Sequence, residues 1–231
     1  MDLSVVVPCF DEERRLPGAL GVAEAYLAGA GRGFELILVD DGSRDRTAEL
    51  MVEAELSRAY VRSIRLPHRG KGRAVAEGVC ASRGELVLIS DVDFSAPLDE
   101  LPKLERAIAE GADVAIGSRA ARGAREVDQP LHRRLMGKTF NLVVQMLLLP
   151  GIWDTQCGFK LLRGEVAREL CARLRTDGFA YDVELLYLAR RAGYRICEIP
   201  VRWVNSDTTR VSALRDPASM LRDVVNIRFR G

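Results

Sequence analysis

Two carboxylates that are one residue apart, Asp91 and Asp93, follow an apolar run that predicts a β-strand over Glu85–Asp91. Carboxylates at a strand end can present oxygen ligands to one hard cation, such as Mg²⁺ or Mn²⁺. A divalent ion held there can bridge two phosphates and neutralise charge as a diphosphate leaves. Alone the triplet is a weak signal, because Asp91 can cap a turn and Asp93 can be an ordinary solvated side chain.

A second acidic turn, Asp40-Asp41-Gly42-Ser43, follows a strand predicted over Phe34–Asp40. One of its carboxylates can accept the N–H of a base ring while the other orients a ribose or a metal ion. The other interpretation is a capping turn before the next helix, but Ser43 or Asp45 supplies such a cap without needing both aspartates. The pair therefore favours a ligand site.

A basic turn, Arg69-Gly70-Lys71-Gly72, follows a strand predicted over Val61–Leu66 and leads into a helix. Its backbone N–H groups and Lys71 can face an anion at the helix N-terminus. The spacing is not that of a P-loop, and no G-x-G-x-x-G follows the first strand, so the sequence does not favour an ATPase or a dinucleotide oxidoreductase. The other interpretation is a turn whose glycines serve its conformation.

These three turns need a parallel sheet to bring them together. The first half alternates short apolar runs with helical patterns, which predicts a doubly wound α/β unit whose strands are buried on both faces. Ligands of such sheets sit beyond the carboxyl ends of the strands, so the turns are expected to meet at one edge. The predicted strands are Leu3–Cys9, Phe34–Asp40, Val61–Leu66, Glu85–Asp91 and Asp113–Ser118, and the helices are Glu12–Ala30, Asp45–Arg58, Gly72–Ser82 and Pro97–Glu110.

The second half is less regular, and only one strand is predicted in it. We expect a single domain over 1–231. The predicted elements after Ser118 are a basic loop over Arg119–Arg134, helices over Leu135–Leu149, Gly164–Arg173 and Tyr181–Ala192, a strand over Ile196–Val204 and a basic helix that ends at Arg230.

Charge divides the chain in the same place. The 231 residues carry 34 basic and 33 acidic side chains, and a net charge of +1 does not indicate generic nucleic-acid binding. Residues 1–118 nevertheless carry a net charge of −7, and residues 119–231 carry +8. The two halves are therefore expected to meet different parts of a substrate pair.

The motifs resemble, in order and spacing, those of inverting family-2 glycosyltransferases of the GT-A fold. In the second half they look like the polyprenyl-phosphate branch of this family and are most similar to dolichyl-phosphate β-glucosyltransferases. The similarity runs nearly from end to end, and the string over 154–161 is its most specific part. The matching segments are 5–12, Val39–Ser43, Arg69–Gly72, Asp91–Asp93, Ile116–Arg119, Asp154–Leu161, Phe179–Tyr187 and Glu198–Trp203.

The resemblance implies that 1–118 bind a nucleotide sugar and that 119–231 bind the acceptor, and it implies a role for individual residues. Asp40 would contact the base, and Asp91 and Asp93 would serve the sugar and a Mg²⁺ or Mn²⁺ ion. Arg119 and Arg133 would grip the acceptor phosphate, and Arg210 would lie near the reacting phosphates. The catalytic set is Asp93, Arg119, Arg133 and Arg210, and the nucleotide-sugar set is Pro8, Phe10, Glu12, Asp40, Asp41, Lys71, Asp91, Val92 and Asp93.

The implied reaction moves a hexose, with glucose from UDP-glucose favoured, onto the phosphate of a polyprenyl or dolichyl phosphate. A monophosphate is already an anion at neutral pH, so its enzyme needs cations that orient it rather than a carboxylate base. Open alternatives are a mannosyltransferase that uses GDP-mannose, a non-catalytic nucleotide-sugar-binding protein, transfer to a soluble hydroxyl, and a phosphatase that also carries an Asp-x-Asp triplet.

Other residues carry weaker expectations. Asp182 and Glu184 are two apart at a helix start, so only one of them is expected to face a substrate. His68 is a lone histidine in a basic loop and is expected at the surface. The apolar stretch Leu142–Leu149 follows a cationic segment, which fits either a buried helix or a helix on an anionic lipid surface.

We expect a cytoplasmic protein that is peripheral at the cytoplasmic face of a membrane. The N-terminal run reads as a strand rather than a signal peptide, and no apolar stretch reaches the length of about 18 residues that a spanning helix needs. Five cysteines without a C-x-x-C pair favour a reducing compartment.

Overall fold

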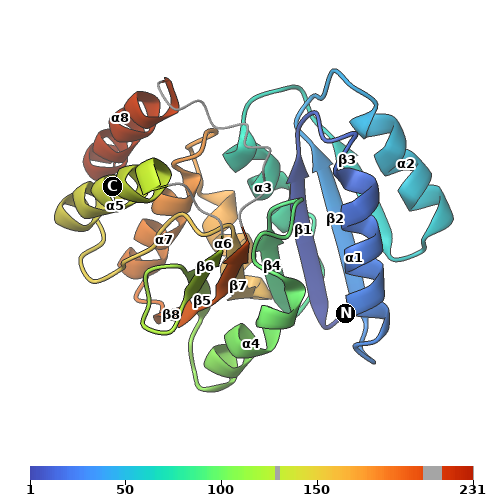
Figure 1. Cartoon of the computed structure of the whole chain (residues 1–231), viewed down its shortest axis with the longest axis horizontal. Helices are drawn as coiled ribbons and strands as arrows, with labels where there is room; N and C mark the ends of the chain where they lie inside the picture. The colour runs from blue at the N-terminus through green and yellow to red at the C-terminus, as the bar shows by residue number, and fades with distance from the viewer. Residues whose placement is uncertain (128–130, 205–214, 231) are drawn as a thin grey trace.

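The fold is that of a computed structural model, which describes residues 1–127, 131–204 and 215–230. Within these ranges the side chains at 131–135, 138 and 215–218 are outside the description. In the described ranges one sheet of seven strands spans both halves of the chain, with the strand order β3-β2-β1-β4-β7-β5-β8 (Figure 1). Its strands are β1 (Leu3–Cys9), β2 (Phe34–Asp40), β3 (Val61–Arg65), β4 (Leu86–Ser90), β5 (Val114–Ser118), β7 (Phe159–Arg163) and β8 (Ile196–Pro200).

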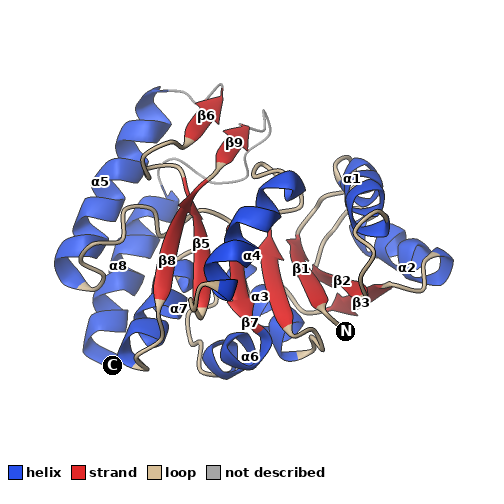
Figure 2. Ribbon diagram, turned by 90° about the horizontal axis from the view of Figure 1, so that it is seen from below, coloured by secondary structure: helices blue, strands red, loops and turns tan. Residues whose placement is uncertain are grey.

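Helices cover both faces of this sheet (Figure 2). Successive residues of β1 alternate between two apolar layers, since Val5 and Val7 belong to one and Val6 to the other. The first layer includes α1 (Leu16–Ala28), α2 (Thr47–Ser57) and α4 (Leu101–Ala109). The second includes α3 (Lys71–Cys80), α5 (Leu131–Leu147), α6 (Gly164–Ala172), α7 (Tyr181–Arg191) and α8 (Arg215–Arg230). Burial on both faces explains why the strands are continuously apolar.

The first half follows its prediction closely. All four strands from β1 to β4 are present, with ends that differ by no more than a residue, and β1 pairs in parallel with both β2 and β4. The helices α1 and α2 fall within the predicted ranges, α3 begins one residue before its predicted start at Gly72, and α4 is preceded by a single 3₁₀ turn at Leu98–Glu100. The predicted α/β fold with a mostly parallel sheet is therefore confirmed.

The second half holds the corrections. Strand β7 was not predicted, because its run Phe159-Lys160-Leu161-Leu162-Arg163 carries a lysine where a buried strand normally has an apolar residue. It runs antiparallel between β4 and β5. The helix α5 begins at Leu131, inside the predicted basic loop, because arginine and leucine are good helix formers.

The predicted strand Ile196–Val204 divides into two. Its first part, β8, pairs with β5 through Pro200. The chain then leaves the sheet at Val201, and β9 (Arg202–Val204) pairs in parallel with the short β6 (Arg125–Val127). Pro200 has no N–H to donate, which suits the end of a strand in the main sheet. Along the chain, β6 follows soon after the carboxyl end of β5. Arg119 lies between these two strands.

Candidate functional site

Three neighbouring parallel strands, β2, β1 and β4, place the acidic turns at one edge of the sheet. Asp40 is the last residue of β2 and is the register partner of Cys9 in β1. Asp91 directly follows β4, on the other side of β1. The parallel arrangement therefore brings Asp40 and Asp91 to the same edge, with the chain that leaves β1 between them.

Asp40 keeps one carboxylate oxygen without a hydrogen bond. Its side chain is buried, and Oδ1 accepts the backbone N–H of Ser43 at 2.9 Å. Oδ2 is also buried and makes no hydrogen bond within the described part of the chain, and Nε of Arg65 is 3.6 Å away. Because a buried acceptor normally has a donor, this oxygen is suited to an N–H of a bound molecule.

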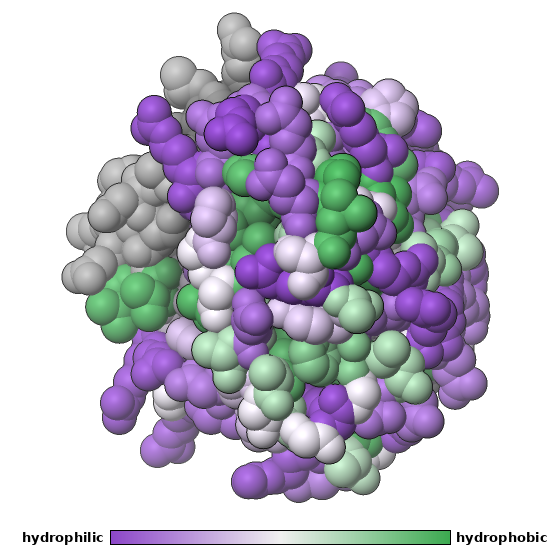
Figure 3. All heavy atoms as spheres, turned by 90° about the vertical axis from the view of Figure 1, so that its right-hand side faces the viewer, coloured by the Kyte–Doolittle hydropathy of each residue, from purple (hydrophilic) through white to green (hydrophobic). Residues whose placement is uncertain are grey.

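A pocket of about 340 Å³ opens beside this carboxylate, between β2, β3 and α2. Apolar side chains of Met51, Val52 and Ile64 form part of its wall, and Asp40 and Arg65 supply the polar part. On the side of the molecule where α1, α2 and β3 lie, apolar side chains gather in the middle of a mainly hydrophilic face (Figure 3). A flat ring with a hydrogen-bond donor at its edge fits such a wall.

Asp41 turns inward and holds the basic turn. Its Oδ1 accepts the backbone N–H groups of Arg69 at 2.9 Å and Gly70 at 3.1 Å. Its Oδ2 lies 2.8 Å from Nδ1 of His68. Both oxygens of Asp41 are therefore engaged by the protein, and this residue positions the turn rather than offering a free carboxylate to a base or a ribose.

The amides of the basic turn also have partners inside the chain. Those of Arg69 and Gly70 bind Asp41, and the N–H of Gly72 donates to the carbonyl of Asp177 at 2.7 Å. Gly70 adopts a φ of +132°, and a Cβ atom there would overlap the same carbonyl, so glycine is required. Two of the amides therefore face the carboxylate of Asp41, and the side chain of Lys71 is left to act on a different group.

Lys71 reaches Asp91. Its Nζ lies 2.5 Å from Asp91 Oδ1, and both side chains are about one quarter exposed, at 23% and 28%. Burial on its own would lower the pKa of Lys71, but the carboxylates of Asp91 and Asp182 offset this and raise the pKa above its ordinary value. The ammonium therefore stays charged at neutral pH.

Arg15 holds Asp93 near the same edge of the sheet. Asp93 Oδ1 accepts the N–H of Ser95 at 3.0 Å, and Oδ2 lies 3.7 Å from Arg15. Arg15 also makes a forked pair with the buried Glu12. Glu12 therefore faces Arg15, and it influences Asp93 through that cation. Burial lowers the pKa of Arg15, whereas its hydrogen bond to Glu12 and the charges of Glu12, Asp93 and Asp91 raise it above the ordinary value.

The remaining members of the predicted nucleotide-sugar set lie in the same region. The ring of Phe10 stacks on His68, with centroids 4.4 Å apart and planes 25° from parallel. Pro8 is partly buried at the end of β1. Val92 is buried in the apolar core, so only its backbone can contribute to a site. His68 is exposed, as expected, and it also contacts Phe10 and Asp41.

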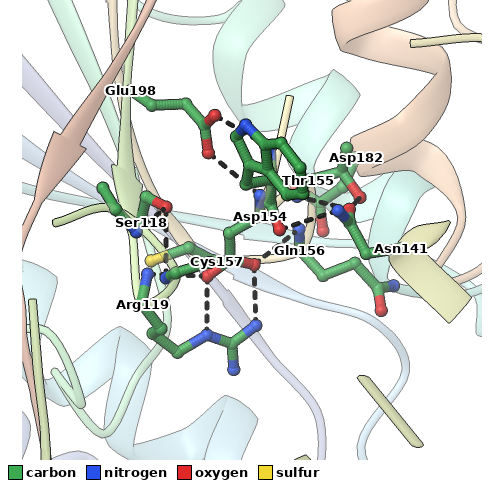
Figure 4. A network of polar contacts seen from close by, with 12 residues as sticks. Ser118, Arg119, Asn141, Asp154, Thr155, Gln156, Cys157, Asp182 and Glu198 are labelled. Carbon is green, nitrogen blue, oxygen red and sulfur yellow. Dashed lines mark hydrogen bonds and ion pairs between the residues drawn. The ribbon is translucent and has the colours of Figure 1, made fainter. Parts of the chain in front are cut away.

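Arg119, at the end of β5, is held in a network of polar contacts (Figure 4). Its Nε and Nη2 bind the two oxygens of Asp154 at 2.8 and 2.9 Å, and its backbone N–H binds Asp154 at 2.9 Å. The guanidinium carbon also lies 4.9 Å from the ring centroid of Trp203. Burial alone would lower the pKa of Arg119, but Asp154 raises it well above its ordinary value. The guanidinium is therefore charged and held in a fixed orientation.

The loop that carries Asp154 is fixed in turn. Glu198 accepts the backbone N–H groups of Trp153 at 2.8 Å and Asp154 at 2.9 Å. Asn141 donates to the carbonyl of Trp153 at 2.7 Å and accepts the hydroxyl of Thr155 at 3.2 Å. Strand β8 and helix α5 thus position the partner of Arg119, which is how the 154–161 string and the Glu198 segment become connected.

Comparison with known proteins decides the family. The profile described as "Glycosyl transferase family 2" matches residues 4–171. The chain belongs to glycosyl transferase family 2. It is thus a glycosyltransferase, and the phosphatase interpretation is set aside.

Curated relatives match over nearly the whole chain. A protein of Dictyostelium discoideum named dolichyl-phosphate beta-glucosyltransferase is 34% identical over 99% of this chain and 74% of its own length. A human protein of the same name is 35% identical over 99% of this chain and 75% of its own length. The resemblance seen in the motifs is therefore confirmed.

Solved structures confirm the GT-A fold. Glucosyl-3-phosphoglycerate synthase from Mycobacterium tuberculosis, solved with Mn²⁺, UDP and phosphoglyceric acid, superimposes with a TM-score of 0.70 over 98% of this chain and 76% of that chain. The same enzyme with Mn²⁺ and UDP-glucose gives a TM-score of 0.69, over 98% and 77%. Sequence identity to both is 20%.

Two members of the predicted catalytic set of this family-2 enzyme lie outside the description. Arg133 falls in the first turn of α5, and its side chain is not described. Arg210 lies in 205–214, which are outside the described residues. Their roles stay predictions.

Asp91 and Asp93 are the residues that would hold a divalent metal ion. Within the described ranges no cluster of three or more His, Cys, Asp or Glu side chains could hold a metal. Asp91 and Asp93 supply hard oxygen ligands, and magnesium sites often combine one or two carboxylates with substrate phosphates. Lys71 lies 2.5 Å from Asp91 Oδ1 and Arg15 lies 3.7 Å from Asp93 Oδ2, so each carboxylate would share a metal ion with a neighbouring cation.

Sequence reasoning missed Arg15, Asp154 and Lys160 as parts of this region. Arg15 joins Glu12 to Asp93, Asp154 holds Arg119, and Lys160 binds Asp182. Each of these contacts pairs opposite charges, and for Asp154 the partner lies 35 residues away. The available signal was charge in unfavourable places, such as a lysine in the middle of an apolar run.

Proposed function

We propose that this enzyme transfers glucose from UDP-glucose to the phosphate of a dolichyl or polyprenyl phosphate, with Mg²⁺ or Mn²⁺ as cofactor. The observation that carries the proposal is the 34–35% identity, over 99% of the chain, to proteins named dolichyl-phosphate beta-glucosyltransferase. The acidic edge and the fixed Arg119 supply groups of the right chemistry for the two substrates. In the reaction a phosphate oxygen bonds to the anomeric carbon, and the bond from that carbon to the diphosphate breaks.

The nucleoside end of the donor has its partner in Asp40. Uracil carries a ring N–H, and Oδ2 of Asp40, which makes no hydrogen bond within the described residues, can accept it. The stacked rings of Phe10 and His68 give an apolar edge near Asp41, where a planar base or ribose can pack. Asp41 and Glu12 contribute indirectly, by fixing the basic turn and Arg15.

The diphosphate end meets Asp93, Asp91 and Lys71. A divalent ion bound by Asp93 and Asp91 would stabilise the negative charge that develops on the leaving diphosphate. Lys71 adds a fixed positive charge beside the same carboxylates. Arg15 keeps Asp93 near the edge of the sheet.

The acceptor needs orientation more than deprotonation. Its phosphate is already anionic at neutral pH, so a carboxylate base is not required. Arg119 is charged and fixed by Asp154, and it presents a guanidinium at the carboxyl end of β5. We assign to Arg119, Arg133 and Arg210 the steering of this phosphate toward the donor.

A lipid acceptor also needs a surface, and α5 and α8 offer one. The two helices pack against each other and lie side by side (Figures 1 and 2). Each has a buried apolar side and an exposed one. The exposed apolar residues are Met136, Leu142, Met146 and Leu147 on α5, and Leu221, Val225 and Phe229 on α8.

Exposed arginines at Arg222, Arg228 and Arg230 border the apolar side of α8. Apolar side chains that alternate with cations suit the surface of an anionic bilayer. None of the helices over the described residues is both long and apolar enough to cross a membrane. We propose that this helix pair rests on the cytoplasmic face of the membrane.

The function is tested by counting transferred sugar. The protein is incubated with Mg²⁺, a polyprenyl phosphate and a radiolabelled UDP-glucose, GDP-mannose or UDP-N-acetylglucosamine, and label in the organic phase is measured. We expect label from UDP-glucose and its loss on addition of a chelator. Label from GDP-mannose alone would replace glucose with mannose in the proposal, and transfer that survives chelation would remove the metal.

The surface is tested by sedimentation with vesicles that contain anionic lipid. We expect the double variant Leu221→Ser and Phe229→Ser to lose binding, since it removes the exposed apolar side of α8. Leu56→Ser on α2 is the matched control, because Leu56 is as exposed as Phe229, at 83% against 84%. Equal binding by both variants would contradict the assignment of this surface.

A further inference from the structure

A lysine and an aspartate form an ion pair in the core beneath the acidic edge. Lys160, in the middle of β7, is fully buried, and its Nζ lies 2.5 Å from Oδ1 of Asp182. Asp182, the second residue of α7, is also buried. The same Nζ donates to the carbonyl of Cys157 at 2.6 Å. Both charges are thus satisfied without contact with solvent.

Stability alone does not account for such a pair. Taking two charges out of water costs free energy that their attraction often does not regain, and apolar replacements of buried pairs are frequently neutral or stabilising. Lys160 also interrupts the apolar run of β7. A charged pair in this place therefore suggests a task in the neighbouring site.

The pair lies beside Lys71. The start of α3 packs directly on the start of α7, since a Cβ atom on Gly72 would overlap the carbonyl of Thr176 and press on Tyr181. Nζ of Lys71 is 5.9 Å from the ring centroid of Tyr181, and the charge of Asp182 stabilises its ammonium. Asp182 consequently faces one cation from β7 and a second from α3.

The row of charges ends at Asp91. Lys71 binds Asp91 Oδ1, and the backbone at Gly158 closes on Asp91 Oδ2, because a Cβ atom there would overlap that oxygen. Gly158 and Lys160 belong to the same short segment. Gly158, at one end of the segment, therefore packs against Asp91. Lys160, at the other end, neutralises Asp182. Charges alternate from the core to the edge of the sheet as Lys160, Asp182, Lys71 and Asp91.

We propose that Lys160 and Asp182 are positioning residues for the donor site. Lys160 neutralises Asp182, so that the Lys71 ammonium remains directed at Asp91 and is not drawn toward the core. Without Lys160, Lys71 is a cation that still acts on the buried carboxylate, and the two aspartates compete for it. This inference rests on the proposed function to the extent that Asp91 serves a nucleotide diphosphate.

The test measures UDP binding by calorimetry in the presence of Mg²⁺, independently of turnover. We expect Lys160→Met to weaken UDP binding by about tenfold, a size typical for groups that orient a ligand-binding side chain. The double variant Lys160→Met and Asp182→Leu removes the competition along with the pair. It is expected to bind UDP within about threefold of the unmodified protein.

Controls separate this role from folding. Arg163→Met removes a cation from the same strand that pairs with Asp113 at 3.5 Å, and UDP binding should not change. If Lys160→Met does not fold by circular dichroism, Lys160→Gln carries the same expectation, because it keeps a hydrogen-bond donor without the charge. The KM for the polyprenyl phosphate should stay constant in all the variants.

The outcomes distinguish two failures. An unmodified protein that does not bind UDP contradicts the proposed function itself. An unmodified protein that binds UDP, with equal binding by folded Lys160→Met, overturns the positioning role and leaves the pair structural. A double variant as weak as the single variant also overturns it, because competition for Lys71 would not be the cause.

Discussion

The acidic edge and the basic segment after β5 position their charged groups by different means. At the acidic edge, Asp40, Asp41 and Asp93 each accept backbone N–H groups of nearby turns. In the basic segment, Arg119 is fixed by a carboxylate 35 residues farther along and by the ring of Trp203. Backbone amides thus hold these acidic groups, whereas side chains of distant segments hold the basic group.

This difference has a consequence for substitutions. Removing Asp93 leaves its neighbour Arg15, 3.7 Å away, still paired with Glu12. Removing Asp154 instead frees Arg119, and removing Arg119 leaves a buried carboxylate whose pKa is held down by that same arginine. Substituting a carboxylate at the acidic edge should therefore lower activity without a second structural effect. Substituting Arg119 or Asp154 should also alter the other member of the pair.

The largest effect is expected at Asp93. Asp93→Ala should lower glucose transfer by about 100- to 1,000-fold, because a group that stabilises leaving-group charge is lost. The measurement is label in the organic phase at saturating donor and acceptor. Asp99→Ala is the control, since Asp99 is exposed and pairs only peripherally with Arg202, at 2.7 Å. Equal activity of the two variants would remove Asp93 from the site.

Glu35 is a second carboxylate of the first half, and its contacts are structural. It therefore provides a comparison for Asp93. Glu35 is buried at the opposite end of β2 and binds Ser4, Arg62 and Arg83. Glu35→Gln should lower the free energy of unfolding by about 2–4 kcal/mol near neutral pH without changing the KM for either substrate.

The pH dependence of this effect has a defined sign. Burial alone would raise the pKa of Glu35, but its hydrogen bonds lower the pKa from 4.5 to about 2. A depressed pKa means that the stabilisation is present above pH 4.5 and is lost as the pH falls toward 2. Urea unfolding of both proteins should show the difference narrowing across that window. A difference that grows on acidification would contradict it.

Arg119 tests the coupled behaviour of the basic segment. Arg119→Ala should raise the KM for the polyprenyl phosphate by about 10- to 100-fold and leave the KM for UDP-glucose unchanged. Asp154→Asn should give a smaller change of the same kind, since Arg119 keeps its charge but loses its orientation. The double variant should be no worse than Arg119→Ala alone. Additive losses would show that the two residues act separately.

The smallest effect concerns Arg133. Arg133→Ala should reduce acceptor use by about tenfold, the effect expected when one charged hydrogen bond to a phosphate is lost. Initial rates at low acceptor concentration measure it. Arg173→Ala is the control. Arg173 is exposed at the C-terminal end of α6 and pairs with Glu169 at 3.4 Å. A KM change for the donor instead would move Arg133 to the acidic edge.

The predictable part of the fold is the part with local rules. Parallel strands that are buried on both faces appear as continuous apolar runs, and the residues after them must share one edge. For this reason Asp40, Asp91 and Asp93 could be brought together from the sequence. The separate roles of Asp40 and Asp41 could not be predicted, because the two residues are adjacent at the end of the same strand. Only the side-chain contacts show that Asp41 turns inward.

The less predictable part depends on pairs that no local pattern announces. Strand β7 contains Lys160, whose burial is explained only by Asp182 in a later helix. The start of α5 was placed too late because a cluster of basic residues was interpreted as a loop. The partner of Arg119 likewise required the fold, although the specific string that contains Asp154 had already been identified as informative.

The antiparallel strand β7 also has a consequence for synthesis. Because β7 separates β4 from β5, a nascent chain that has released only β1 to β4 leaves the outer side of β4 without a neighbour. The ribosome must extend the chain past Arg163 before this open edge is covered. A fragment cut after Ser118 would therefore be prone to self-association, and the two halves are expected to be recovered as folded protein only when they are made as one polypeptide.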